Sequence, residues 1–343
     1  MLDFESDETH LLLNPRTSPE ERARLERLYA SAPALAGHVW LSTSGTTGAL
    51  KLTALSKHAL LVSAAAVNRH LVATEYDVWC SVLPTFHVGG LGIHARAFLS
   101  GARVVSAAWD PQEFASMREI TLASLVPAQV NDLVREGLRV PARLRAIVVG
   151  GGALSDDVYR RGRDLGWPLL PSYGMTECCS QVATATLDSP ELLLLDHVEA
   201  RIESDGRLAL RSDALLTGYA TEDGFVDPKI DGWFMTEDIA TVGGRVLRVL
   251  GRSGDFVKIG GESVDLSRLD RILSELAFDA AVIAVPDERL GHVIALAVAS
   301  GDADAIVSAF NARVFPFERA RRVIRVAEIP RTPLGKIMRA RLR

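Results

Sequence analysis

The sequence predicts an α/β fold: a large N-terminal domain with a mostly parallel sheet plus a small antiparallel sheet or barrel, and a small C-terminal α+β domain. Three observations predict it. From Val39 onward, short apolar runs alternate with helical patterns. Residues 197–211 alternate apolar and polar side chains, as in an antiparallel sheet with one face in water. After the segment Gly251–Gly254, residues 255–343 are enough for a second, smaller domain.

The elements follow from local signals. A helix is expected over residues 18–31, because Ser18 can act as N-cap, Pro19 suits the first helical position and Glu21 lies three residues after the cap. The apolar run 39–41 leads into a Gly/Thr/Ser loop, and strands are expected at residues 78–82, 103–106, 123–126 and 146–149. The expected helices are residues 57–71, 111–119 and a segment capped by Ser155.

The C-terminal region repeats this pattern on a smaller scale. Helices are expected at residues 266–276 and 306–314, and strands at residues 280–285 and 294–299. The domains are therefore placed at residues 1–251 and 252–343.

Composition excludes several classes of protein. The net charge of −5 leaves no electrostatic footprint for nucleic acid. Apolar stretches fall far short of a membrane span, and the acidic N-terminus lacks the features of a secretory signal, so a cytoplasmic protein without membrane insertion is expected. The three cysteines form no CxxC pattern, which argues against a disulfide framework or a zinc site.

The strongest local signal is the segment Thr43-Ser44-Gly45-Thr46-Thr47-Gly48-Ala49-Leu50-Lys51. Its glycines let the backbone approach an anion, and its hydroxyl groups and lysine can bind phosphate oxygens. The glycine spacing differs from a Walker A loop. The alternative is a polar turn with no ligand.

This segment resembles the phosphate loop of the acyl-adenylate-forming superfamily, which includes acyl-CoA synthetases and peptide-synthetase adenylation domains. Leu50 stands where a proline is usual. Further motifs follow in the family's order as far as Lys336. The resemblance implies an enzyme that uses ATP, Mg²⁺ and coenzyme A, with a mobile C-terminal domain.

Two segments of the large domain resemble the family's substrate pockets. In Pro84–Gly90, Phe86 and His87 would line the acyl pocket, although a lone histidine is more often a hydrogen-bonded structural residue. In Gly150–Ala153, the last three residues (Gly151, Gly152 and Ala153) would pack on the adenine. A simple turn between a strand and a helix is the alternative there.

Ser172-Tyr173-Gly174-Met175-Thr176-Glu177 resembles the motif in which an aromatic ring stacks on adenine. Thr176 and Glu177 would serve the phosphates and Mg²⁺. A carboxylate suits that position, because Mg²⁺ is commonly bound through one or two carboxylates plus substrate phosphates.

Three later motifs complete the resemblance. Asp238 would accept hydrogen bonds from the ribose hydroxyls, with Glu237 in place of the customary glycine. Arg252 would contact ribose or phosphate, and Gly254 would be the pivot of the small domain, since glycine tolerates large φ/ψ changes. The residues that would line the thiol channel are Lys258, Gly260 and Gly261.

The loop Pro330–Ile337 resembles the one that carries the catalytic lysine. Lys336 would bridge the carboxylate and the α-phosphate and stabilise charge in the adenylation transition state. The alternative is a solvated surface lysine.

Within the superfamily, the o-succinylbenzoate–CoA ligase family is the most similar. The likeness rests on Cys178–Gln181, Leu83–Arg96 and Leu125–Ala128. Because that substrate has a second carboxylate, a fixed donor is needed, and Arg96, His87 and Gln181 are the candidates. The phosphate loop lies nearer the start of the chain than in that family, which implies a shortened N-terminal region.

The sequence therefore predicts an AMP-forming acid–thiol ligase that acts through an acyl-adenylate, with o-succinylbenzoate as the expected acid. The alternatives are a ligase for another aryl or medium-chain acid and a non-catalytic nucleotide-binding remnant. The candidate catalytic residues are Lys336, Glu177, Thr176 and His87, with Glu177 and Thr176 also at the metal. The candidate nucleotide- and CoA-binding residues are Thr43, Ser44, Gly45, Thr46, Thr47, Gly48, Lys51, Gly151, Gly152, Ala153, Ser172, Tyr173, Gly174, Asp238, Arg252, Lys258, Gly260 and Gly261. The candidate acid-binding residues are Phe86, His87, Arg96 and Gln181.

Overall fold

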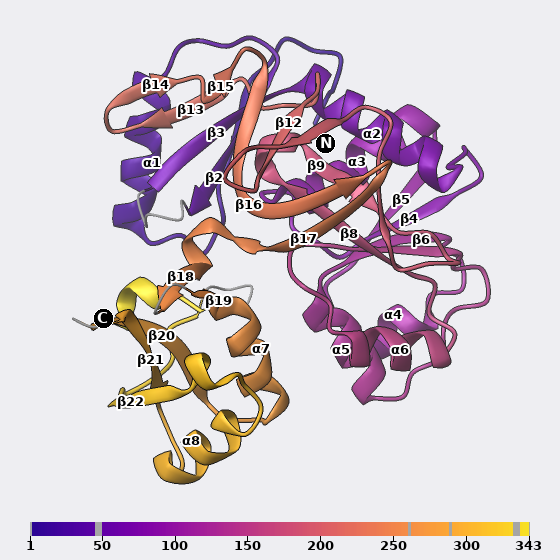
Figure 1. The fold of residues 1–343 in the computed structure, drawn as a ribbon. Helices are drawn as coiled ribbons and strands as arrows, with labels where there is room; N and C mark the ends of the chain where they lie inside the picture. The colour runs from indigo at the N-terminus through magenta and orange to yellow at the C-terminus, as the bar shows by residue number, and fades with distance from the viewer. Residues whose placement is uncertain (1, 45–49, 260–261, 288–289, 332–336, 343) are drawn as a thin grey trace. The chain divides into compact units, whose positions relative to one another are not determined.

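The computed structural model describes residues 2–44, 50–259, 262–287, 290–331 and 337–342 (Figure 1). The chain divides into two compact units. The first contains residues 1–202, 209–236 and 242–248, and the second contains residues 203–208, 237–241 and 249–343. The predicted domain boundary between residues 251 and 252 rests on an expected pivot for domain movement, and it stays a prediction.

A parallel sheet forms the centre of the first unit. Its strands, in spatial order, are β5 (Arg103–Ser106), β4 (Val78–Ser81), β6 (Leu122–Leu125), β7 (Ala146–Val149) and β8 (Leu169–Met175). The antiparallel strand β9 (Ser180–Thr184) continues it beside β8. Both faces of a parallel sheet are normally covered by helices, so its strands are apolar on both sides.

The two faces are covered by different helices (Figure 1). On one face, Cys80, Leu125 and Ile147 pack in a core with residues of α4 (Pro111–Ser116), α5 (Pro127–Arg135) and α6 (Asp156–Asp164). On the other, Trp79 and Val148 pack against α2 (Lys57–Leu71) and α3 (Val88–Ser100). Neighbouring residues of one strand thus serve opposite cores.

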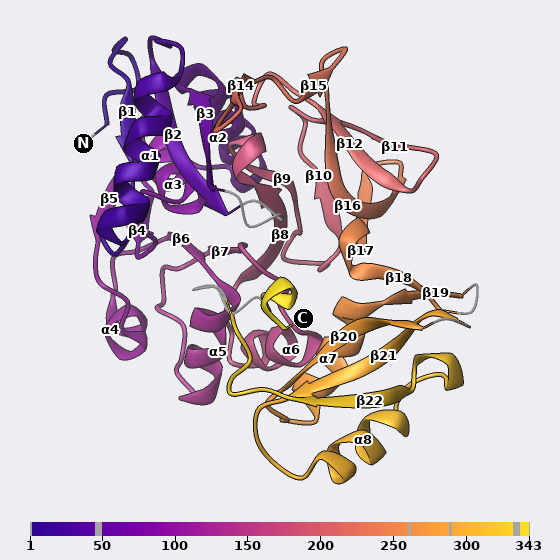
Figure 2. The same ribbon diagram turned by 90° about the vertical axis from the view of Figure 1, so that its left-hand side faces the viewer.

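A second sheet of the first unit has the order β1-β2-β3-β13-β14. Its strands are β1 (His10–Leu12), β2 (His38–Ser44), β3 (Leu50–Ser56), β13 (Gly218–Thr221) and β14 (Gly224–Val226). Helix α1 (Pro19–Ser31) lies along it and contributes Leu25 and Leu28 to a core with Trp40 (Figure 2). Ser18 is the N-cap as predicted, because its Oγ accepts a hydrogen bond of 3.2 Å from the Glu21 amide.

The antiparallel part extends the central sheet in the order β11-β12-β16-β17-β10-β9, with β15 beside β16. These strands are β10 (Leu192–Leu194), β11 (Glu199–Ile202), β12 (Arg207–Arg211), β15 (Lys229–Ile230), β16 (Trp233–Gly243) and β17 (Val246–Arg252). They form an open sheet rather than a barrel, and the predicted fold class is confirmed in that form.

The second unit is a small α+β arrangement. Its elements are the 3₁₀ turn η2 (Ser253–Asp255), β18 (Phe256–Ile259), β19 (Glu262–Asp265), α7 (Leu266–Glu275), β20 (Ala280–Asp287), β21 (Gly291–Val298), α8 (Ala303–Asn311), η3 (Pro316–Glu318), β22 (Ala320–Arg325) and η4 (Arg339–Arg341). Its core joins Leu269 of α7, Val282 of β20, Leu296 of β21 and Phe310 of α8. Within the described residues of the chain, no helix has the length and apolar character needed to cross a membrane.

Most predicted elements are present, and the differences have local causes. The helix predicted over residues 111–119 ends at Ser116, since Met117 is extended. Helix α3 was not predicted, because Gly89, Gly90 and Gly92 lower the helix propensity of its first turns. Gly90 is required there, since a Cβ would lie 2.3 Å from the Pro84 carbonyl oxygen.

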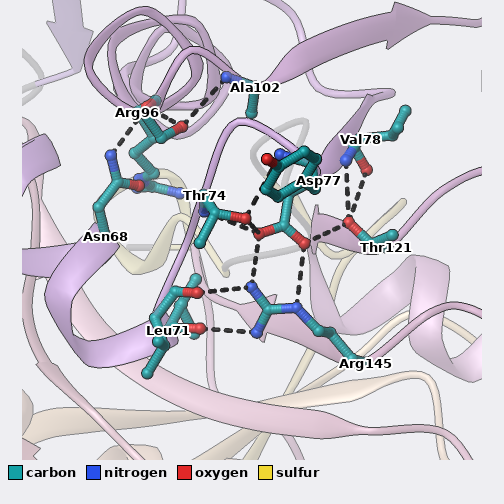
Figure 3. Close-up of polar contacts among 12 residues, drawn as sticks. Asn68, Leu71, Thr74, Asp77, Val78, Arg96, Ala102, Thr121 and Arg145 are labelled. Carbon is teal, nitrogen blue, oxygen red and sulfur yellow. Dashed lines mark hydrogen bonds and ion pairs between the residues drawn. The ribbon is translucent and has the colours of Figure 1, made fainter.

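A polar cluster ties together the amino ends of three parallel strands (Figure 3). Arg145 Nη2 lies 2.7 Å from Asp77 Oδ2, and Thr121 Oγ1 donates to Asp77 Oδ1 at 2.7 Å. Arg145 also donates to the Leu71 carbonyl at the end of α2 at 2.6 Å. Burial alone would raise the pKa of Asp77, but the hydrogen bonds from Arg145 and Thr121 lower it to about 2. The cluster lies at the amino ends of the strands, so it does not occupy their carboxyl ends.

Candidate active site

Several candidate residues of the first unit follow the carboxyl ends of the parallel strands. Phe86 and His87 follow β4, Gly151 follows β7, and Thr176 and Glu177 form the 3₁₀ turn η1 (Thr176–Cys178) directly after β8. Open α/β sheets bind ligands at this edge, because the loops that leave neighbouring strands meet there.

The two ends of the expected phosphate segment lie on neighbouring antiparallel strands. Thr43 and Ser44 end β2, and Lys51 pairs with Thr43 from β3. Lys51 therefore lies on a strand, although the sequence placed it in the loop. Thr43 Oγ1 lies 3.2 Å from Thr53 Oγ1, also on β3. Gly45, Thr46, Thr47 and Gly48 lie outside the described residues.

Glu177 is the centre of a three-residue cluster in the first unit. Lys51 Nζ lies 3.5 Å from Glu177 Oε1, and the Tyr219 hydroxyl donates to the same oxygen at 2.8 Å. Lys51 Nζ also lies 3.6 Å from the centroid of the Tyr219 ring. The sequence predicted Lys51 and Glu177, and the structure brings them together. The sequence did not predict Tyr219, which follows Glu177 by 42 residues in a turn-rich stretch.

This cluster fits a magnesium–nucleotide site. Among the described residues, no group of three or more His, Cys, Asp or Glu side chains could hold a metal ion. A single carboxylate is nevertheless what Mg²⁺ needs when phosphate oxygens complete its coordination. The Glu177 side chain is 15% exposed, so it is within reach of a ligand from solvent. Thr176 directly precedes it in η1.

The turn after Glu177 is tightly constrained. A Cβ on Gly174 would lie 1.8 Å from the Ser180 carbonyl oxygen, so only glycine fits that position. Cys179 and Ser180 have positive φ angles of 51° and 112°. Burial raises the pKa of the Cys179 thiol. Such burial favours the neutral thiol over the thiolate.

Arg96 of α3 is a buried cation with neutral partners. Its side chain is almost fully buried, and its two terminal nitrogens donate to Ser124 Oγ and Ser180 Oγ, each at 3.2 Å. Arg96 is in none of the described ion pairs, and its Nε has no hydrogen-bond partner among the described residues. Burial lowers the pKa of Arg96 to about 10, so it remains charged at neutral pH.

Gln181, which follows Ser180 on β9, is buried as well. Its Oε1 accepts a hydrogen bond from Thr184 Oγ1 at 2.5 Å, whereas its Nε2 has no partner among the described residues. Arg96 and Gln181 thus each offer a buried N–H donor that the described protein groups do not use. A ligand with a carboxylate could accept from such donors.

His87 and Phe86 lie at the start of α3, with ring centroids 4.7 Å apart. His87 keeps contact with solvent, yet desolvation by neighbouring atoms lowers its pKa, so its ring is neutral at pH 7. It makes no side-chain cap bond to α3. This leaves both rings available to line a pocket.

The expected adenine segment is exposed after β7. Gly151 has a φ of +80°, which favours glycine. Ser172 Oγ donates to the Val149 carbonyl at 3.0 Å and so joins β8 to the end of β7. Gly152 and Ala153 follow in the same exposed turn, and Tyr173 continues β8 toward Glu177.

The remaining candidates belong to the second unit. Arg252 Nε donates to Asp238 Oδ1 at 3.1 Å, which joins the two residues expected at the ribose. Ser253 Oγ donates to Glu237 Oε2 at 2.5 Å. Lys258 lies on β18, whereas Gly260, Gly261 and Lys336 lie outside the described residues.

The site and fold define a class of protein. The family model described as AMP-binding enzyme matches residues 18–215, more than half of the chain, and the chain belongs to this family.

Two relatives share the name of a particular enzyme of this family. The chain is 30% identical over 325 residues to the 2-succinylbenzoate–CoA ligase of Listeria monocytogenes, an alignment that covers 88% of this chain and 68% of that protein. It is 27% identical over 353 residues to the enzyme of the same name from Bacillus cereus, covering 95% of this chain and 73% of that protein.

A solved structure is similar over the same range. The o-succinylbenzoate CoA synthetase (MenE) of Bacillus subtilis in complex with the acyl-adenylate intermediate OSB-AMP has a TM-score of 0.80 and 26% identity, covering 91% of this chain and 69% of that chain. The same enzyme in complex with ATP and a magnesium ion has a TM-score of 0.79 and 26% identity, covering 91% and 70%.

Proposed function

We propose that this chain is an AMP-forming ligase that joins o-succinylbenzoate to coenzyme A through an acyl-adenylate. The observation that carries the proposal is the buried Arg96, whose charge meets two serine hydroxyls and the Trp79 ring, and no anion, among the described groups. A buried cation without an anion is costly. A substrate with one reacting carboxylate and one spare carboxylate would supply that anion.

The adenylation step would use the carboxyl edge of the sheet. Lys51 and Thr43 are positioned to hold phosphate oxygens, and Glu177 to hold Mg²⁺. When bound, Mg²⁺ would neutralise phosphate charge. Asp238 would accept from the ribose hydroxyls, with Arg252 beside it. Gly151, Gly152, Ala153 and Tyr173 would form the adenine pocket.

The other roles rest on the motifs. Lys336 would stabilise charge between the reacting carboxylate and the α-phosphate. Phe86 and His87 would line the acyl group, and a neutral His87 suits an apolar aromatic ring. The thiol of coenzyme A would then reach the acyl-adenylate past Lys258, Gly260 and Gly261. The absence of a membrane-spanning helix among the described residues is compatible with a place in the cytoplasm.

The test compares three acids. Pyrophosphate exchange and kcat/KM are measured with o-succinylbenzoate, benzoate and a fatty acid of similar size, at saturating ATP, Mg²⁺ and CoA. We expect o-succinylbenzoate to be preferred by about 100-fold or more, because benzoate would leave Arg96 buried and unpaired, at a cost of about 3–5 kcal/mol.

Substitutions assign the preference to a residue. Arg96→Ala should remove most of the preference for o-succinylbenzoate, while benzoate turnover changes little. Arg96→Lys should keep part of that preference. Arg103→Ala is the matched control, since Arg103 is 59% exposed and pairs with Glu119 at the surface. His87→Ala and Gln181→Ala test the other two candidates. Preference for benzoate or the fatty acid in the unmodified protein would contradict the assigned acid. If none of the acids supports pyrophosphate exchange, the alternative of a non-catalytic nucleotide-binding remnant would be favoured.

A further inference from the structure

Tyr219 is placed by the register of the second sheet of the first unit. Strand β13 pairs with β3 so that Tyr219 is directly opposite Thr53. Lys51 lies two residues before Thr53, on the same face of β3. A tyrosine reaches such a diagonal neighbour across a strand pair, which accounts for the 3.6 Å between Lys51 Nζ and the ring centroid.

The same side chain reaches Glu177 from the opposite direction. Its hydroxyl donates to Glu177 Oε1 at 2.8 Å, and the backbone also connects the two segments, because the Leu216 amide donates to the Glu177 carbonyl at 2.8 Å. Burial, followed by the charge and hydrogen bond of Glu177, raises the pKa of the Tyr219 hydroxyl. In this pair the hydroxyl is the donor and the carboxylate oxygen is the acceptor.

Tyr219 thus contacts Lys51 and Glu177, the two charged residues of the three-residue cluster. The ring face holds the ammonium of Lys51 by a cation–π contact, and the hydroxyl fixes one oxygen of the Glu177 carboxylate. The Tyr219 hydrogen bond and the ion-pair distance to Lys51 are both to Oε1, and we assign the cation to Oε2. Groups that orient a ligand in this way typically change metal affinity by about 10–100-fold when they are removed.

We propose that Tyr219 is a positioning residue for the magnesium–nucleotide complex, acting through Glu177 by its hydroxyl and through Lys51 by its ring. The proposal rests on the nucleotide site of the proposed function, and it does not depend on which acid is used. The two halves of the side chain have separable effects. The hydroxyl governs metal affinity, and the ring governs nucleotide affinity.

The experiment measures metal binding directly. Mn²⁺ is titrated into the protein with α,β-methylene-ATP present, and bound Mn²⁺ is followed by electron paramagnetic resonance. We expect Tyr219→Phe, which keeps the ring and removes the hydroxyl, to weaken Mn²⁺ binding about 10-fold. Tyr219→Leu should also weaken binding of the nucleotide analogue. Tyr76→Phe is the matched control, because Tyr76 is 79% exposed.

A second readout separates positioning from a structural role. In pyrophosphate exchange, Tyr219→Phe should need about 10-fold more Mg²⁺ for half-maximal rate and should recover the normal rate at saturation. In a Glu177→Gln background, Tyr219→Phe should cause no additional loss of Mn²⁺ affinity, because its route of action is already removed.

Three outcomes would overturn the proposal: unchanged Mn²⁺ affinity in Tyr219→Phe, an exchange defect that Mg²⁺ does not restore, or full additivity with Glu177→Gln. Failure of the proposed function would look different. The unmodified protein would then show no exchange with any acid, while the Mn²⁺ titration would still report on Tyr219.

Discussion

Gly174 lies on β8, three residues before Glu177, where the backbone passes close to the Ser180 carbonyl. Because a Cβ there would lie 1.8 Å from that oxygen, Gly174→Ala must displace the turn that presents Glu177. We expect a loss of about 3 kcal/mol in the free energy of unfolding, at the upper end of overpacking effects, measured by urea denaturation. Gly243→Ala, at a position with open space around it, should change stability by less than about 0.5 kcal/mol. Equal stabilities for the two variants would show that the turn can relax.

At the scale of residues, the sequence predicted what a local motif contains. Glu177 and Lys51 were found because each belongs to a short motif. Tyr219 was not, because its role arises from the pairing of β13 with β3, which brings it beside Lys51 and Glu177. A pattern confined to a few consecutive residues carries no information on that pairing.

The elements of the central sheet are joined at their amino ends by Asp77. Its pKa falls from 3.8 to about 2 in the folded protein. Its ionised form therefore stabilises the fold at neutral pH by about 2 kcal/mol, at about 1.4 kcal/mol for each pKa unit. We expect Asp77→Asn to lose about this amount at pH 7, measured by urea denaturation.

The contribution of Asp77 to the free energy of unfolding should depend on pH in a defined direction. Because the folded pKa of Asp77 is lowered, its contribution is complete above about pH 4 and is lost as the pH falls toward 2. The difference between Asp77→Asn and the unmodified protein should shrink over that interval. Asp196→Asn is the control, since the Arg69–Asp196 pair is half exposed and should contribute less than about 1 kcal/mol. A constant difference from pH 7 to pH 2 would assign the effect to something other than the Asp77 charge.

Elements were predicted well where apolar spacing decides them and poorly where packing does. Helix α2 and strands β5 and β7 have the predicted bounds, because α2 has helical apolar spacing and the two strands are short β-branched apolar runs. Helix α3 was not predicted because of its glycines, of which Gly90 is required by the close approach of the Pro84 carbonyl. Strand β3 was also not predicted, since Lys51 and Thr53 are polar and their strand is defined by its partners β2 and β13.

At the scale of the whole molecule, the chain combines two compact units, and the main stretch of the second begins at Val249. The residues expected to act on one nucleotide are divided between the units. Lys51, Glu177 and Tyr219 belong to the first, and Asp238 and Arg252 belong to the second. A rotation about Gly254 would move only the residues that follow it, such as Lys258, while Asp238 and Arg252 precede that position. In an enzyme with two half-reactions, such a movement would exchange the groups that face the acyl-adenylate.

Gly254, in the turn η2 directly before β18, is the expected pivot. Proline would fix φ near −65° at that position. We expect Gly254→Pro to slow one half-reaction about 100-fold and leave the other within about threefold, since a misplacement of about 1 Å has effects of that size. Pyrophosphate exchange measures the first half-reaction, and CoA thioester formation from supplied acyl-adenylate measures the second.

Lys336→Ala supplies the reference for this experiment. Its loss of activity should be confined to the adenylation half-reaction, whichever orientation the units adopt. A Gly254→Pro variant trapped for thioester formation should match the Lys336→Ala pattern, and one trapped for adenylation should show the reverse. Melting temperatures near that of the unmodified protein would exclude global unfolding as the cause. If both rates in Gly254→Pro stay near normal, the pivot lies at another residue. If both fall together with an unchanged melting temperature, the two half-reactions share one orientation, and the exchange of groups between units is wrong for this chain.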